Sequence, residues 1–474
     1  MRTGLRMPAA DGGNASGPIL SPEVVTFSPM PTRRGGTLIF FLITLALCSW
    51  HLDNGRNANT ISRAAMVAAL VESHSLCIDP YQELTADKAL VAGHYYSEKA
   101  PLPALIVWPF WSMANGLHWI TPGDHGLLTD GLLQLGGFLC GSVPLALLIL
   151  LLYRDLRHSP VPLPRGWIAL LPFMGSFLFV YSGSFHGHLL AALFLVLAWR
   201  MRTREANVLA TALASAAILC EYSLFVFPLV WFLQDAFQRK WKVIGAQVFG
   251  GLPGLLFLGF MNLMITGKPW TLPYADVAEH VDRSGGILGL GMPTLAGLWG
   301  LLFSSFRGLF THAPVTIVCA IVALVAIRRN GLKWTALHPL VIPSLLLIAM
   351  ISGHSMWWGG WAFGPRHLTA VAALLLLAAL PKLPDKPWAD GALVWLGVWG
   401  LVVSVSAKST AWYSLPTTVL HPFREMILPY VLQRGFTVMQ WPVAVGFSPI
   451  MGTFFFAIAL LLALKYMRRT PPST

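Results

Sequence analysis

Charged residues are scarce in this chain. Only 11% of its 474 residues are Asp, Glu, Lys or Arg, whereas 55% are hydrophobic. A soluble globular domain carries about 25% charged residues. The scarcity excludes an ordinary soluble protein and indicates one that is embedded in lipid, where a helix needs about 20 apolar residues to cross the hydrocarbon core.

Cysteine motifs are also lacking, and no signal peptide is expected. The five cysteines show no Cys-x-x-Cys spacing, and four of them lie in apolar runs, so a disulfide framework is not expected. No small-residue cleavage site follows a short apolar run near Met1. Residues 1–35 are rich in Gly, Pro and Ser and are expected to form a flexible cytoplasmic tail, as is the short segment 467–474.

No single basic patch accompanies the net charge of +12. The positive residues are instead spread over short loops and both ends of the chain, which is the pattern of the positive-inside rule for membrane proteins. The sequence therefore predicts no nucleic-acid partner. It predicts a multi-pass protein of the cell inner (plasma) membrane, with both termini in the cytoplasm and its site on the extracytoplasmic side.

Apolar runs alternate with basic loops across residues 36–466. This alternation predicts an all-α polytopic membrane protein with about twelve transmembrane helices. The expected spans are 37–50, 131–152, 166–183, 188–199, 206–219, 223–234, 244–265, 313–327, 337–352, 368–381, 391–407 and 442–464. The expected outer segments are 51–130, 267–310, 353–366 and 408–440.

The first outer segment holds a proline- and tryptophan-rich apolar stretch, residues 101–119. Tryptophans are enriched where membrane and water meet, so this stretch predicts an interfacial helix that lies in the headgroup layer. The alternative is that the stretch spans the membrane, which would put the basic residues 153–157 outside, against the charge rule.

Ionisable residues gather on the predicted outer side, and such residues in a membrane protein usually mark a site. Lys99 directly precedes a helix expected to start at Pro101, since proline is favoured at the first helical position. The N–H groups of a helix start attract anions, so Lys99 and this helix would bind the phosphate of a lipid. The alternative is a snorkelling lysine that only sets the depth of the helix.

The outer segment 353–366 combines three tryptophans and four glycines with Arg366. Rings such as those of Trp357 and Trp358 could hold the face of a sugar, and Arg366 could clamp a phosphate through paired N–H donors. Arg307 is a further candidate for a phosphate contact. The alternatives are an aromatic belt with a turn for the tryptophans and a charge that caps the next span for Arg307.

Carboxylates and histidines supply candidates for acid–base chemistry. Asp53 directly follows the first span and could take a proton from an acceptor hydroxyl or amine, with Asp79 and Asp87 as alternatives, although a solvated loop acid is the simpler interpretation of each. Glu221, between two spans, is as well explained by a buried ion pair. His186 and His188, with His94, His354 or Glu98, are candidates for a divalent metal site, which the sequence separations do not establish.

Several motifs occur in an order that is similar to one known family. They are Asn57-Ala58-Asn59, Arg63, Ile78-Asp79-Pro80, Asp87-Lys88, Tyr95-Tyr96-Ser97-Glu98-Lys99-Ala100-Pro101, Glu221-Tyr222, Phe303-Ser304-Ser305-Phe306-Arg307-Gly308-Leu309, Trp357-Trp358-Gly359-Gly360 and Gly364-Pro365-Arg366. Over residues 37–380 the chain resembles the GT-C superfamily of polytopic glycosyltransferases, in the bacterial branch related to lipid A aminoarabinose transferase and the protein O-mannosyltransferases.

The resemblance implies transfer of a hexosyl or pentosyl group from a polyprenyl-phosphate donor to a glycan, lipid or protein acceptor. The family's phosphate-contacting lysine falls on Lys99, and Ala100 replaces the first proline of its motif. Arg366 and Arg307 would share the donor phosphate. The residues expected to contact sugar or acceptor are Tyr95, Tyr96, Glu98, Trp357, Trp358, His186, His188 and Glu221.

The chain departs from this family where its catalytic acid is expected, since Asn57, Ala58 and Asn59 stand there. Either Asp53 serves as the base, or Asp79 or Asp87 folds in, or the enzyme is impaired. Two other classes stay open: a transporter or flippase of lipid-linked saccharides, and a non-catalytic membrane scaffold. The nearly charge-free spans favour the enzyme over a transporter.

Overall fold

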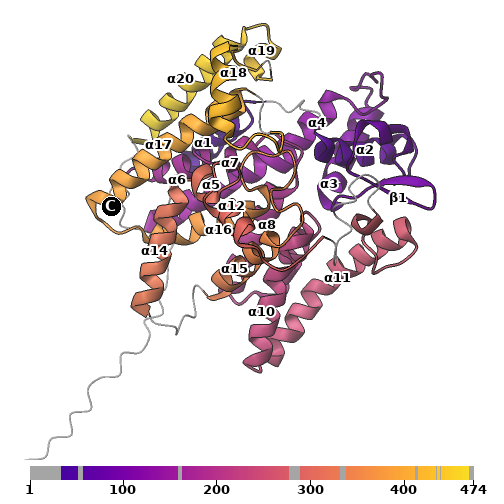
Figure 1. Cartoon of the computed structure of the whole chain (residues 1–474), viewed down its shortest axis with the longest axis horizontal. Coiled ribbons are helices and arrows are strands. Elements are labelled where there is room, and N and C mark those ends of the chain that lie inside the picture. The colour runs from indigo at the N-terminus through magenta and orange to yellow at the C-terminus, as the bar shows by residue number, and fades with distance from the viewer. Residues whose placement is uncertain are drawn as a thin grey trace, which may run out of the picture.

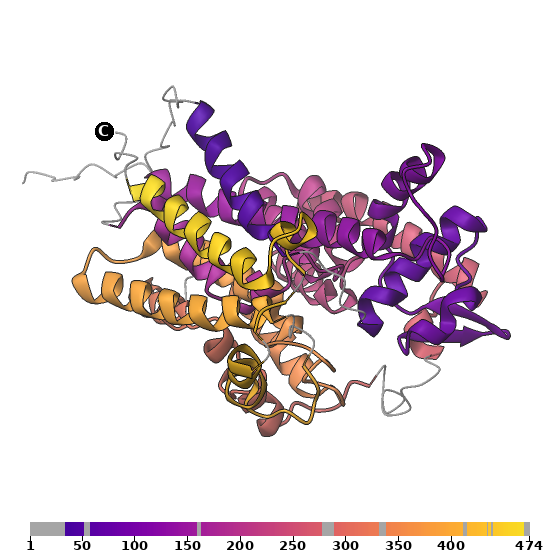
Figure 2. The same ribbon diagram turned by 90° about the horizontal axis from the view of Figure 1, so that it is seen from above.

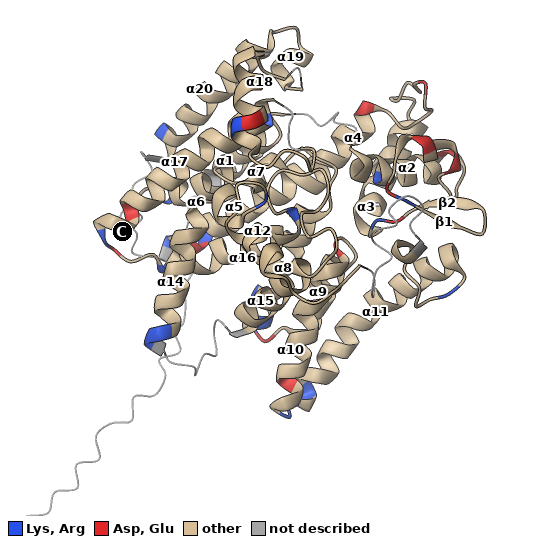
Figure 3. Cartoon of the chain, in the orientation of Figure 1, with Lys and Arg blue, Asp and Glu red and all other residues tan. Residues whose placement is uncertain are grey.

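The computed structural model of the chain is mostly helical (Figure 1). Most of the ribbon carries no charge, and many of the charged residues lie near helix ends, as at the ends of α10, α11 and α14 (Figure 3). The structure describes residues 34–51, 57–158, 163–276, 289–330, 338–410, 415–433, 435–437 and 439–468.

The helices follow one another with short connections. The α-helices are α1 (Arg34–Cys48), α2 (Ala58–Glu72), α3 (Leu102–Gly116), α4 (Asp130–Gly137), α5 (Val143–Asp155), α6 (Arg165–Met174), α7 (Phe177–Val180), α8 (His188–Thr203), α9 (Asn207–Ile218), α10 (Val226–Phe237), α11 (Trp241–Thr266), α12 (Leu295–Leu302), α13 (Leu309–His312), α14 (Val315–Asn330), α15 (His338–Ser352), α16 (Thr369–Ala379), α17 (Pro387–Ser409), α18 (Leu428–Gln433), α19 (Trp441–Ala444) and α20 (Pro449–Arg468). The 3-10 segments include η1 (Asp79–Leu84), η4 (Tyr222–Phe225), η5 (Pro273–Asp276) and η7 (Arg366–Leu368), and the π-helical segments are η2 (Phe138–Ser142) and η9 (Phe423–Ile427).

Four helical stretches among the described residues are long and apolar enough to cross a membrane: Asp130–Asp155, Trp241–Thr266, Pro387–Ser409 and Pro449–Met467. Shorter apolar helices, among them Gly36–Cys48, Asn207–Ile218 and Pro339–Ser352, accompany them. The chain is thus a mostly helical protein with helices suited to a bilayer. The count of twelve crossings stays a prediction.

Each predicted span contains a helix, and some spans are interrupted. The span predicted at 166–183 is divided into α6 and α7 around Gly175. A Cβ on Gly175 would lie 2.5 Å from the carbonyl oxygen of Gly397 in α17. Glycine at this position therefore lets the two backbone segments come into contact. The break therefore serves close packing of α6 and α7 against α17.

A π-helical turn interrupts the span predicted at 131–152. Where α4 passes through η2 into α5, glycines 137 and 141 face the segment after α7: a Cβ on Gly137 would lie 1.8 Å from the carbonyl oxygen of Gly183. Bulges of this kind are common at functional sites. Here the bulge lets residues 181–187 run directly across the helix and deliver the start of α8.

One short β-hairpin accompanies the helices, and the fold stays mostly helical, as predicted. Strand β1 (Lys88–Val91) pairs antiparallel with β2 (His94–Ser97), and Val91 lies opposite His94. The connecting Ala92 and Gly93 both have positive φ, as a two-residue type I′ hairpin turn requires. Strands of four residues with mixed polarity leave no clear alternating pattern, so the sequence did not reveal them.

The hairpin belongs to a small group of elements at one end of the molecule. Helices α2 and α3 pack against each other, β2 contacts α2 and η1, and β1 contacts η5. Figures 1 and 2 show α2, α3 and the hairpin on the side opposite α17 and α20. Helix α3 occupies the stretch predicted to be an interfacial helix, and its place relative to a membrane stays a prediction.

Candidate functional site

A cavity of about 360 Å³ lies where the group of α2, α3 and the hairpin meets the helical body. Its wall combines charged and polar residues with apolar ones from segments far apart in the sequence. The charged and polar lining residues are Asn59, Arg63, Glu98, Lys99, His188, Glu221, Tyr222, Ser223, Tyr274, His354, Arg366 and His367. Apolar lining residues include Ile218, Phe225, Leu258, Leu272, Leu290, Met350, Ile351 and Met356.

Six of the residues selected from the sequence line this one cavity: Glu98, Lys99, His188, Glu221, His354 and Arg366. The lining does not include Tyr95, Tyr96, Asp79, Asp87, His186, Arg307, Trp357 or Trp358. Asp53 lies outside the residues that the structure describes. The structure therefore brings Lys99 and Arg366 to the same side of the molecule, as one headgroup would need.

Lys99 is already paired with two carboxylates. Its Nζ lies 2.7 Å from Asp87 Oδ2 and 2.5 Å from Glu98 Oε1, and these side chains are almost fully buried. Asp87 precedes β1 and Glu98 follows β2, so the hairpin register holds them near each other. Two acids share one ammonium, so much of the Lys99 charge is compensated within the protein.

The start of α3 offers less to an anion than the sequence predicted. Pro101 and Pro103 have no N–H, and the N–H of Leu102 donates to the carbonyl oxygen of Leu219 at 3.0 Å. Free N–H groups are what makes a helix start attract phosphate. Residues 101–103 therefore offer no free N–H to a phosphate, and phosphate binding at Lys99 stays a prediction.

Two buried arginines present N–H groups without partners. Arg63 is 3% exposed and Arg366 is 8% exposed, and the Nε of each has no hydrogen-bond partner. Arg63 donates instead through Nη1 to Asn59, both to its carbonyl oxygen at 3.1 Å and to its side chain. A buried unpaired donor costs about 1–3 kcal/mol, so both guanidiniums fit an anion that enters the cavity.

A glycine allows Arg366 to reach the cavity wall. A Cβ on Gly359 would lie 3.1 Å from Arg366 Nε, and Gly359 has φ +74°, a conformation that favours glycine. The predicted Gly-Gly pair, Gly359 and Gly360, thus makes room for the guanidinium of Arg366.

Glu221 holds a pair of cavity histidines. His188 Nδ1 lies 2.6 Å from Glu221 Oε2, and His367 Nδ1 lies 3.7 Å from Oε1. Burial acts to raise the pKa of Glu221, but the charge and hydrogen bond of His188, with His367, outweigh it and hold this pKa well below its usual range. Burial lowers the pKa of His367.

His188 keeps one ring nitrogen without a partner. An ionised carboxylate only accepts hydrogen bonds, so Nδ1 of His188 carries the proton that Glu221 binds; in the neutral imidazole, Nε2 then holds a lone pair. Nε2 is buried and has no hydrogen-bond partner. The arrangement is that of a general base whose tautomer is set by a carboxylate.

The side chain of Arg307 forms hydrogen bonds within the protein. Its guanidinium is buried and donates to the carbonyl oxygens of Phe306, Trp358, Gly360 and Leu415 at 3.0–3.3 Å. These bonds tie α12 and the turn before α13 to the Gly359-Gly360 loop. Its predicted phosphate contact stays untested, but in this structure Arg307 positions the loop that carries the cavity wall.

The aromatic residues that were predicted to contact the sugar or acceptor are not part of the cavity lining. Trp357 packs on Gly300 of α12, where a Cβ would lie 2.1 Å from its ring, and its ring meets that of Trp358 edge-on at 5.7 Å. Tyr95 stacks under Lys88, and Tyr96 pairs with Ala89 in the hairpin. His186 Nδ1 lies 2.7 Å from Ser184 Oγ, beside the His188 ring.

The predicted histidine metal site is not assembled. In the described part of the chain, one group of three ligand side chains converges within 4.8 Å, and it consists of Cys77, Asp79 and His94. His186, His188, His354 and Glu98 are not in such a group.

Several cavity residues were not selected from the sequence for their own chemistry, among them Asn59, Arg63 and His367. Asn59 and Arg63 lie one helical turn apart on α2, a spacing that puts both on one face, and His367 follows Arg366. Arg63 entered only through the resemblance, and Asn59, too, appeared only in the motifs of the resemblance.

Neither a family model nor a curated protein matches this sequence.

Proposed function

We propose that this chain is a membrane glycosyltransferase of the GT-C type, which transfers a hexosyl or pentosyl group from a polyprenyl-phosphate donor to an envelope glycan, lipid or protein. The observation that carries the proposal is a cavity whose largely apolar wall includes two buried arginines, Arg63 and Arg366, each with an Nε–H that has no hydrogen-bond partner. Guanidinium N–H groups match the oxygens of a phosphate.

The apolar part of the wall supports a lipid-linked donor. Leu258 contributes to it from α11, a 26-residue helix whose apolar surface is mostly unburied within the chain. Such a helix presents its outer face to lipid. A polyprenyl tail would lie along α11 in the bilayer while its phosphate enters between Arg63 and Arg366.

The chemistry follows from these positions. An acceptor hydroxyl or amine attacks the anomeric carbon of the sugar, and the bond from that carbon to the phosphate oxygen breaks. The electron pair of this bond stays on the polyprenyl phosphate, whose growing negative charge is stabilised by Arg63 and Arg366, with Lys99 nearby. Stabilisation of charge that develops in the transition state is the largest contribution in many enzymes.

His188 is our candidate for the base. Its Nε2 would take the proton of the attacking group, while Glu221 holds Nδ1–H and stabilises the imidazolium that forms. This assignment supplies a base for a chain that has Asn57, Ala58 and Asn59 where the family that it resembles has its catalytic acid. Asn59 carries no charge and here binds Arg63. Asp87 is a weaker candidate, because it is paired with Lys99. Asp53 stays a prediction.

The wider setting belongs to the same proposal. It includes twelve spans, both termini in the cytoplasm, an inner-membrane location and an outer, extracytoplasmic cavity. No nucleic acid is expected as a partner.

Transfer in proteoliposomes tests the function. The full chain would be reconstituted with a radiolabelled panel of polyprenyl-phosphate hexoses and pentoses and an extract of envelope glycans and lipids. Wild-type protein should move label to the extract and release polyprenyl phosphate. Arg366→Lys and Arg63→Lys should each slow transfer by about 10²-fold or more, since one lost contact to transition-state charge costs that much.

Arg329→Lys is the matched control, because Arg329 is exposed at the end of α14, and it should leave transfer unchanged. Transfer that is equal in the Arg366 variant and the control would remove the phosphate role of Arg366. Movement of the labelled lipid across the bilayer without sugar transfer would favour the flippase instead.

A further inference from the structure

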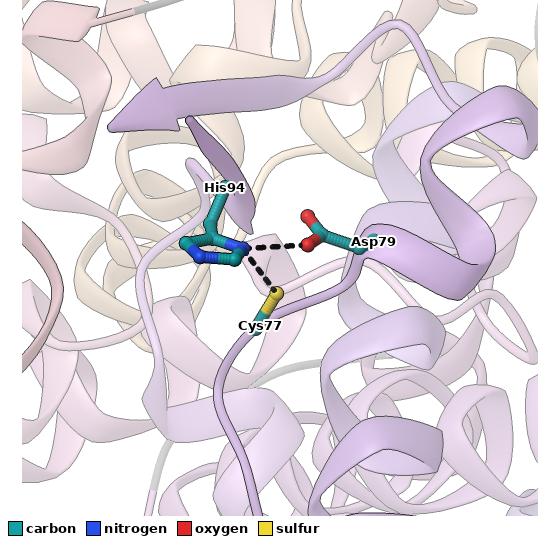
Figure 4. Close-up of side chains that lie close together, drawn as sticks. All are labelled: Cys77, Asp79 and His94. Atoms are coloured by element: carbon teal, nitrogen blue, oxygen red, sulfur yellow. Dashed lines mark hydrogen bonds and ion pairs between the residues drawn. The ribbon is translucent and has the colours of Figure 1, made fainter. Parts of the chain in front are cut away.

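We propose that Cys77, Asp79 and His94 form a binding site for Zn²⁺ on the surface of the first outer segment. This site is separate from the cavity and its argument does not depend on the glycosyltransferase proposal. The three residues come from the chain before η1, the first residue of η1 and the first residue of β2 (Figure 4).

The three ligand atoms already point toward one another. His94 Nδ1 lies 2.7 Å from Asp79 Oδ2 and 3.9 Å from Cys77 Sγ, and all three atoms lie within 4.8 Å of one another (Figure 4). Zinc binds sulfur at about 2.3 Å and nitrogen or oxygen at about 2.0–2.2 Å in a tetrahedron. Ligand atoms around such an ion are therefore about 3.3–3.7 Å apart, so small side-chain rotations suffice.

The backbone holds this geometry in place. Ile78 lies between Cys77 and Asp79 in the sequence, and its N–H donates to the carbonyl oxygen of Tyr95 at 2.8 Å. Cys77 forms a β-bridge with Tyr96. The N–H of Tyr95 donates to the other oxygen of Asp79 at 2.6 Å. That bond orients the carboxylate in the way that outer hydrogen bonds orient metal ligands.

The donor set selects the metal. A thiolate with an imidazole suits Zn²⁺, whereas Mg²⁺ and Ca²⁺ prefer oxygen alone. The thiol of Cys77 would lose its proton to solvent on binding, and the ion would replace the present Asp79–His94 ion pair. His94 is 60% exposed, so a water molecule or a partner's side chain could take the fourth position.

Bound zinc would fasten η1 to the hairpin. The hairpin leads directly into Glu98 and Lys99, so the ion would stiffen the support of this edge of the cavity without entering it. Ligands that bind only the folded chain raise its thermal stability.

Metal analysis of the full chain tests the site. Protein purified in detergent through a tag without histidine would be stripped with EDTA, dialysed against ZnCl₂ and measured by plasma mass spectrometry. We expect one zinc per chain in the wild type and a rise in melting temperature. Replacement by Co²⁺ should give the absorption of a cobalt–thiolate bond.

Cys77→Ser and His94→Gln should lose both the bound zinc and the cobalt–thiolate absorption. His118→Gln is the matched control, since His118 is another exposed histidine of the same outer segment, and it should keep both. Zinc retained equally in all variants, or absent from the wild type, would overturn the proposal. Because the readout is metal content, it stands apart from any failure of sugar transfer.

Discussion

Glu221 is the residue on which the proposed base depends. Replacing it with glutamine keeps the shape but removes the charge that fixes the His188 tautomer and stabilises the imidazolium. We expect Glu221→Gln to lower kcat by about 10²-fold, a loss typical of disabled acid–base catalysis, with little change in KM. Steady-state kinetics of transfer measure the split. Glu205→Gln, at an exposed acid, is the control, and a loss confined to KM would contradict the assignment.

The pH dependence of stability reports on the same carboxylate. The pKa of Glu221 is held well below its usual range, so its stabilising contribution is complete above the pKa that it has in the unfolded chain, about 4.3. That contribution is lost as the pH falls through the lower, folded pKa. Melting curves between pH 7 and 3 should fall less steeply for Glu221→Gln than for the wild type, and parallel curves would speak against a stabilising contact between Glu221 and His188.

Arg307 makes a different prediction because its bonds are internal. Lysine keeps the charge but lacks the planar fork, so Arg307→Lys leaves several of the four carbonyls without donors. Each unsatisfied buried group costs about 1–3 kcal/mol. We expect a lower melting temperature in detergent and a raised KM for donor, as the Gly359-Gly360 loop loosens. Arg329→Lys again serves as control, and an unchanged melting temperature would reassign Arg307 to ligand binding.

At the scale of elements, the sequence predicted most helices because apolar runs alternate with short basic loops. It missed the hairpin, and with it the pairing of Lys99, because Asp87 meets Glu98 and Lys99 only through the register of two four-residue strands. It also missed that Leu102 donates to Leu219, which occupies the helix start. The charge rule predicted Lys99 and Arg366 on one side of the membrane; both line the cavity, and their side of the membrane stays a prediction.

The packing of α11 against α9 supplies a test at the same scale. A Cβ on Gly250 would lie 2.1 Å from the carbonyl oxygen of Val208, whereas nothing lies within 4 Å of one on Gly245. Gly250→Leu should therefore push α11 away, with an overpacking cost of about 1–3 kcal/mol, and move Leu258 in the cavity wall. Gly245→Leu is the control in the same helix. Melting temperature and donor binding should both fall for Gly250→Leu alone, and equal behaviour would show that α11 is loosely held.

For the whole molecule, the charge distribution makes the proposal depend on sidedness. Basic residues near α9–α11 and α14 must face the cytoplasm if the cavity is to receive a donor from the outer leaflet. In this topology, His118, after α3, and Lys268, after α11, lie outside, whereas Glu205 and Lys240 lie inside; all four are exposed on the protein.

Single cysteines at these four positions test the topology in intact cells. The background is Cys77→Ser, because the four other native cysteines are buried. A maleimide that cannot cross membranes should label His118→Cys and Lys268→Cys directly, and should label Glu205→Cys and Lys240→Cys only after permeabilisation. If residues 101–119 instead crossed the membrane, with the N-terminus still in the cytoplasm, the pattern would invert: Glu205→Cys and Lys240→Cys would react directly, and His118→Cys and Lys268→Cys only after permeabilisation. The two edges of the cavity would then lie on opposite faces, and no single lipid headgroup could reach both Lys99 and Arg366.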